Sequence, residues 1–116
     1  MLMDKDKIKQ QECSNDGQSI FLYFIPMVGV YAAYGLSAYY TTLVTNPYLS
    51  YSNEVDMPVA LLTRDQIKYM RGSLLKLEHV TNLYYHFHMR LVIGDSGYEK
   101  WLKRTFPLFV CNDGLK

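Results

Sequence analysis

Residues 17–53 contain no Asp, Glu, Lys or Arg, and this uncharged stretch constrains the fold more than any other feature of the sequence. Its centre, residues 20–44, is the most apolar segment of the chain. A segment without a charged face is either buried at the centre of a domain or inserted in a bilayer. The rest of the chain is amphipathic, so we expect it to fold around this stretch.

Pro26 divides the stretch, because proline is tolerated in the first turn of a helix and breaks a helix interior. The sequence therefore predicts an extended segment over residues 20–25 and a central apolar helix over residues 26–44. Small side chains at i, i+4 spacing form a helix-packing stripe on that helix: Gly29, Ala33 and Ser37. Such a stripe allows a neighbouring helix to approach closely.

A membrane span is the alternative for this segment, since it is long enough to cross a hydrocarbon core of about 30 Å. Against it, Tyr31 and Tyr34 would lie at mid-depth instead of at the interfaces, where tyrosine is enriched. Pro26 falls inside the span, and no basic residue follows before Arg64. These features favour a buried helix and leave a single-span membrane subunit, anchored by residues 20–44, as the alternative.

The N-terminal residues 1–16 mix acidic and basic side chains without an apolar period, which predicts a charged, weakly ordered arm. Residues 17–116 then form a single globular domain, because a chain of 116 residues can bury one modest core. Two cysteines, Cys13 and Cys111, suit neither a disulfide framework nor a four-ligand zinc site. We expect reduced thiols and a cytoplasmic protein.

The strongest local signal is a capping box, in which Thr63 and Gln66 satisfy each other's backbone amides at a helix start. Apolar residues recur from Ile67 at intervals of 3 and 4, which predicts a helix over residues 64–91. Residues 83–93 also alternate with period two, so a strand remains open there.

Two tyrosines follow the turn-forming pair Asn46-Pro47, and we expect both Tyr48 and Tyr51 to pack back on the core. A second capping box over residues 96–99 predicts a short helix that ends near Thr105.

These signals together predict a mainly α fold, a small single helical domain with a central apolar helix. The alternative is an α+β fold with short strands at residues 20–25, 57–62 and 83–93.

No catalytic set, phosphate-binding glycine loop or dinucleotide fingerprint is present, so we predict no catalytic residues, no cofactor and no metal. His86 and His88 would point to nearly opposite sides of a helix. On a strand they would share one face and could chelate a metal, although a third ligand is missing.

Basic and histidine side chains would gather on one face of the helix over residues 64–91, opposite its apolar face. This basic stripe is a candidate partner-binding surface: Arg64, Lys68, Arg71, His79, His86 and Arg90. It would suit an acidic partner protein or a nucleic-acid backbone.

A net charge of +1 argues against a domain that binds nucleic acid through its overall charge. The sequence contains 11 tyrosines, whose rings with one polar end suit interfaces. We therefore expect a non-enzymatic protein-protein interaction module, an accessory subunit or small inhibitor that binds a partner protein. A homo-oligomer, a nucleic-acid-binding module and a membrane protein remain open as alternatives.

Overall fold

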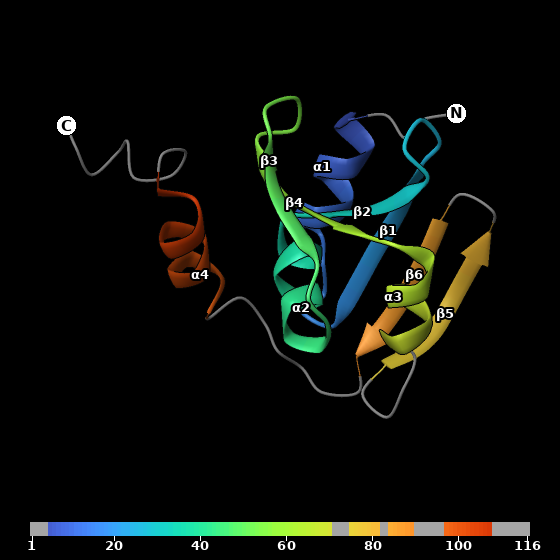
Figure 1. The fold of residues 1–116 in the computed structure, drawn as a ribbon. Coiled ribbons are helices and arrows are strands. Elements are labelled where there is room, and N and C mark those ends of the chain that lie inside the picture. Colours follow the sequence, from blue (N-terminus) through green and yellow to red (C-terminus); the bar gives the residue numbers. More distant parts are fainter. Residues whose placement is uncertain (1–4, 71–74, 82–83, 90–96, 108–116) are drawn as a thin grey trace.

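The computed structural model describes residues 5–70, 75–81, 84–89 and 97–107, which form an α+β fold (Figure 1). A six-stranded antiparallel sheet is its central layer. The elements follow one another as α1 (Lys5–Cys13), β1 (Ser19–Ile25), β2 (Val30–Tyr34), α2 (Leu36–Val44), β3 (Tyr48–Ser52), β4 (Met57–Leu62), α3 (Arg64–Met70), β5 (Leu75–Thr81), β6 (Tyr84–Met89) and α4 (Tyr98–Thr105).

The strands lie side by side in the order β3-β4-β2-β1-β6-β5, so β1 is paired on both sides. Its side chains alternate between two buried faces. Ile20 and Leu22 lie on one face, and Phe21 and Tyr23 lie on the other. A strand buried on both faces reads as a continuous apolar run, which accounts for the sequence of β1.

The two faces of the sheet are covered unequally. On the first face, α2 packs over β1 and β2 and contributes Ala38 and Tyr40 to the main core. On the second face, Ile8 of α1 packs against Phe21 and Tyr23 in a smaller cluster that includes Val55. In Figure 1, α4 lies at the β3 end of the molecule, opposite the β5 end.

The predicted mainly α fold is wrong, and so is its central helix over residues 26–44. A turn begins after Ile25, whose carbonyl accepts hydrogen bonds from the amides of Val28 and Gly29 at 3.3 and 2.9 Å. The chain then returns as β2, because β-branched and aromatic side chains suit a paired strand. None of the helices among the described residues is long and apolar enough to cross a membrane.

The predicted stripe of small residues does not exist as a helix face. Gly29 lies in the exposed turn, Ala33 lies in β2, and Ser37 lies near the start of α2. Ala33 and Ser37 are fully buried, but they belong to different elements.

The predicted helix over residues 64–91 is also wrong for residues 75–81 and 84–89, which are strands, whereas residues 71–74, 82–83 and 90–91 lie outside the described residues. Helix α3 ends at Met70, and β5 and β6 form a hairpin that supplies the second partner of β1. The period-two pattern was therefore the correct one. The strands of the α+β alternative are confirmed as β1, β4 and, for residues 84–89 of the predicted 83–93, β6; residues 83 and 90–93 lie outside the described residues.

Two local predictions are confirmed. The amide of Thr63 donates to Gln66 Oε1 at 2.9 Å, and the amide of Gln66 donates to Thr63 Oγ1 at 3.2 Å, as a capping box requires. The C-terminal helix α4 ends at Thr105. The charged arm, in contrast, contains α1, and its residues Ile8 and Glu12 are buried instead of solvated.

We predict that Gly35→Ala destabilises the fold more than Gly29→Ala. Both glycines have positive φ, 60° and 70°, and Gly35, with ψ −127°, also lies outside the left-handed helical region that other residues can adopt at a cost of about 1 kcal/mol. At Gly35 a Cβ would also lie 3.3 Å from Met57 Sδ, whereas at Gly29 it would meet nothing within 4 Å. Denaturant unfolding should show about 2 kcal/mol lost for Gly35→Ala and about 1 for Gly29→Ala. Equal losses would show that neither the backbone conformation of Gly35 nor its contact with Met57 adds to the cost.

Candidate functional site

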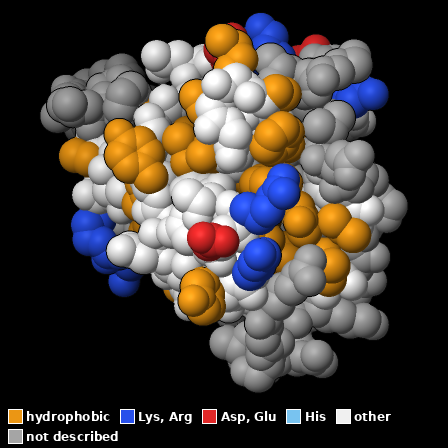
Figure 2. Space-filling view, turned by 45° about the vertical axis from the view of Figure 1, so that its right-hand side comes forward, with side chains coloured by type: hydrophobic (Ala, Val, Ile, Leu, Met, Phe, Trp, Pro, Cys, Tyr) orange, Lys and Arg blue, Asp and Glu red, His pale blue; other side chains and the backbone are white. Residues whose placement is uncertain are grey.

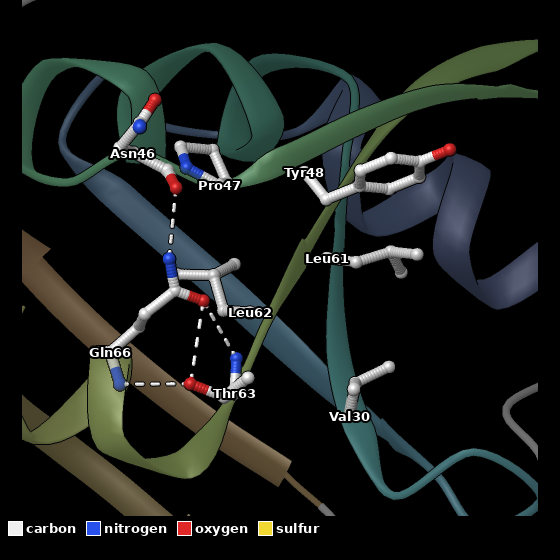
Figure 3. A pocket seen from close by; sticks show the side chains of 8 residues that line it. All are labelled: Val30, Asn46, Pro47, Tyr48, Leu61, Leu62, Thr63 and Gln66. Atoms are coloured by element: carbon white, nitrogen blue, oxygen red, sulfur yellow. Dashed lines mark hydrogen bonds between the residues drawn. The ribbon is translucent and has the colours of Figure 1, made fainter.

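An open apolar groove of about 410 Å³ lies where β2 and β3 begin and β4 ends. No charged residue lines it; its walls are formed by Val30, Asn46, Pro47, Tyr48, Leu61, Leu62, Thr63 and Gln66. In Figure 3 the side chains of Val30, Leu61 and Tyr48 point to the same side of the sheet. We call this site the apolar groove.

Strand register explains the apolar wall of the groove. Tyr48 of β3 is the pairing partner of Leu61 in β4, and Leu61 is in turn opposite Ala32 of β2. Paired residues in antiparallel strands point to the same face. Val30, two residues before Ala32, therefore extends the same row.

The opposite wall is fixed by hydrogen bonds of Gln66. Its side-chain amide donates to the carbonyl of Asn46 at 2.9 Å, while its Oε1 accepts from Thr63 (Figure 3). One side chain thus caps α3 and ties it to the loop between α2 and β3. The wall is held in place by the same capping box that the sequence predicts.

Large apolar side chains are exposed around the groove. Tyr48 on its rim is 71% exposed, and Met27 in the turn before Val30 is 90% exposed. On the neighbouring helix α3, Arg64 and Lys68 are exposed. Figure 2 views the side of the molecule on which α3 lies, where hydrophobic surface is interrupted by Lys and Arg side chains.

The structure divides the predicted basic stripe among separate elements. Arg64 and Lys68 lie on α3, His79 lies on β5, and His86 lies on β6. Arg71 and Arg90 lie outside the described residues. A single helical face that carries all six residues is therefore not present, and the nucleic-acid alternative loses the geometry on which it depended.

The two histidines of β6 share one sheet face, as the strand alternative predicts. His86 Nε2 lies 3.1 Å from Ser19 Oγ, and His88 Nε2 lies 3.5 Å from Asp16 Oδ2. Burial would raise the pKa of Asp16, but hydrogen bonds from Gln18 and Ser19 and the neighbouring His88 outweigh it and lower that pKa. Within the described ranges, no group of three or more His, Cys, Asp or Glu is arranged to hold a metal ion.

A second polar centre lies inside the protein at Glu12, which is only 4% exposed. Its Oε1 accepts the amide hydrogen of Ser37 at 3.2 Å, and its Oε2 accepts the hydroxyl hydrogen of Ser37 at 2.7 Å. Ser37 Oγ in turn accepts the amide hydrogen of Phe21 at 3.0 Å. We call these three residues the Glu12 network.

The Glu12 network supplies acceptors for backbone amides that neither strand pairing nor a helix cap satisfies. On β1, only Tyr23, Phe24 and Ile25 pair with β2, so the amide of Phe21 bonds to Ser37 instead of to a strand. Helix α2 begins after Gly35, which has no side chain to cap it. Glu12 therefore supplies, from another helix, the acceptor that Ser or Asp usually supplies at an N-cap.

Burial raises the pKa of Glu12 to about 7, although hydrogen bonds from Ser37 and Asn15 oppose the change. Burial, followed by the nearby Glu12 carboxyl, also raises the pKa of Tyr23. A cavity of about 290 Å³ lies beside the network, lined by Glu12, Cys13, Gly35, Leu36, Met57, Tyr98 and Glu99. The described part of the chain leaves no buried side-chain nitrogen or oxygen without a hydrogen-bond partner.

The sequence predicts neither the Glu12 network nor the apolar groove, for different reasons. Glu12 belongs to a charged segment, and its only signal is that it lies four residues after Ile8, on the same helix face. For the groove, the prediction that Tyr51 packs on the core is confirmed by its contact with Phe106 at 5.6 Å between ring centroids. The same prediction is wrong for Tyr48.

Comparison of this chain with protein-family models, curated proteins and solved structures yields no significant match.

We predict that Ser37→Ala lowers the free energy of unfolding by about 2 to 4 kcal/mol, because it leaves both the amide of Phe21 and an oxygen of Glu12 without their partner in a buried site. Denaturant unfolding near pH 6 measures the loss. The control is Ser50→Ala on β3, where Ser50 is half-buried, with an expected change within about 0.5 kcal/mol. Similar values for both variants would contradict the role of the network.

Proposed function

We propose that this chain is a non-enzymatic protein-binding module, an accessory subunit or small inhibitor, which receives an apolar segment of a partner protein in the apolar groove. The observation that carries the proposal is Tyr48, a large aromatic side chain that lies 71% exposed on the rim of an uncharged groove. Exposed apolar patches of this kind mark interaction sites on soluble proteins.

The chemistry of the rim supports this choice. Tyrosine is enriched among the residues that dominate binding energy, because its ring buries a large area and its hydroxyl can stay solvated. Arg64 and Lys68 on the neighbouring helix α3 add positive charge, which Asp65 on the same helix offsets in part. A partner segment that combines an apolar anchor with acidic residues would satisfy both features.

The groove is suited to contact rather than chemistry. Its lining has no carboxylate, histidine, cysteine or lysine, so it offers no group that would activate the hydroxyl of Thr63 or Tyr48 as a nucleophile. Asn46, Thr63 and Gln66 supply the polar part, and Gln66 is already committed to hydrogen bonds. As part of the proposal, we place the protein in the cytoplasm, where the exposed free thiol of Cys13 would stay reduced.

We predict that Tyr48→Glu weakens partner binding. A library of random 12-residue peptides displayed on phage would be selected on the wild-type protein, and the recovered peptides synthesised. These peptides should carry a large apolar residue beside acidic ones. Fluorescence anisotropy should show an affinity at least about tenfold lower for Tyr48→Glu, since the variant removes an aromatic anchor and adds a carboxylate to the rim.

Val80→Glu is the control, because Val80 is 46% exposed on β5, at the far edge of the sheet from β3, and does not line the groove. This variant should bind the selected peptides like the wild type. Equal weakening by both substitutions, or a selection that returns no binding peptide, would contradict the proposed function. Thermal unfolding of both variants checks that the fold is unchanged.

A further inference from the structure

We propose that α1 is a proton-controlled latch, which stays docked on the sheet while Glu12 is protonated and is released when this carboxyl group ionises. The inference concerns α1, which contributes no residue to the lining of the apolar groove. It is independent of the proposed function.

Few contacts hold α1 on the sheet. Ile8 and Glu12 are its buried residues, and Ile8 enters a small cluster with Phe21, Tyr23 and Val55. Gln11 adds polar contacts, accepting the hydroxyl hydrogen of Tyr23 and donating to the hydroxyl of Tyr84 at 3.3 Å. The remaining surface of α1 is mainly charged and solvated. Glu12 is therefore a large part of what docks this helix.

The docked site accommodates a neutral carboxyl group without loss of hydrogen bonds. A protonated Glu12 can donate its hydrogen to Ser37 Oγ, 2.7 Å away, while its other oxygen still accepts the amide of Ser37. An ionised Glu12 keeps three donors, two from Ser37 and one from Asn15, but has no positive side chain to compensate its charge among the described residues that shift its pKa. A buried charge without a counter-charge is strongly disfavoured.

The groups that face Glu12 from the surrounding elements do not supply that compensation. They are the hydroxyls of Tyr23, Tyr84 and Tyr98, each affected by the charge of Glu12. Their pKa values are raised, so they stay neutral at physiological pH. Glu99 and Cys13 line the adjoining cavity, where a carboxylate or a thiol cannot balance a negative charge.

The direction of the effect follows from the two pKa values of Glu12. The pKa is about 7 when α1 is docked and near the ordinary 4.5 when the helix is released, so docking takes up a proton between these values. Docking is strongest below pH 4.5, weakens as pH rises toward 7, and changes no further above it. The ratio of released to docked α1 should rise by roughly a hundredfold over this range.

We predict that Glu12→Gln removes this dependence, because the glutamine side chain reproduces the hydrogen bonds of the protonated carboxyl group. Hydrogen exchange of the backbone amides in the second half of α1 measures release directly. After correction for intrinsic exchange rates, wild-type protection should fall at least about tenfold from pH 5 to pH 8. In Glu12→Gln it should stay constant and match the wild-type value at pH 5.

Asp6→Asn is the control, since Asp6 is an exposed carboxylate on the same helix, and it should behave like the wild type. Amides of β4 and β6 serve as an internal reference and should keep their protection at both pH values. Equal pH dependence in wild type and Glu12→Gln would overturn the proposal. Parallel loss of protection in α1, β4 and β6 would also overturn it, because that pattern is global unfolding. Tyr48→Glu should leave α1 exchange unchanged, which separates this test from that of the groove.

Discussion

The burial of β1 on both faces is the constraint on which the rest of the structure depends. Ile20 and Leu22 require α2 above them, and Phe21 and Tyr23 require α1 below them. The strand also needs partners on both edges, which β2 provides across the adjacent turn and β6 provides from a distant part of the sequence. Each covering element has one apolar side that only β1 and its neighbours can bury. The positions of the surrounding helices and strands therefore follow from the need to cover and pair this one apolar strand.

Where the pairing of β1 with β2 stops, hydrogen bonds to side chains satisfy the backbone amides. β2 ends at Tyr34, and the amide of Phe21 would then lack a partner inside the protein. The Glu12 network satisfies this amide and the start of α2 with one serine and one carboxyl group. An apolar residue at position 12 would avoid the burial of a carboxyl group but would leave Ser37 without its acceptor. The pKa of Glu12 is raised because the carboxyl group is buried in order to make these hydrogen bonds.

The sequence predicts local features of this fold better than its class. The capping box at Thr63 and Gln66 is recognisable because its two hydrogen bonds join residues three apart. Residues 26–44 fit both a buried helix and a hairpin, because an uncharged segment suits either structure. Only the long-range pairing of Tyr31 with Leu62 distinguishes the two. The helix predicted over residues 64–91 is too long for a similar reason. Residues 84–89 fit both periods, and the strand is favoured only once β1 is known to need a second neighbour. The groove and the Glu12 network depend on such long-range pairing.

The absence of charge over residues 17–53 has more than one physical cause. Burial accounts for it in β1, in most of β2 and on the inner side of α2, because a charge there would lack solvent or a partner. Burial does not account for it at Met27, Val28 and Tyr48, which are exposed and could carry charges without cost to the fold. Two of these three lie in the turn that leads into Val30, and the third lies on the rim of the apolar groove. These apolar side chains belong to the surface that the proposed partner would cover.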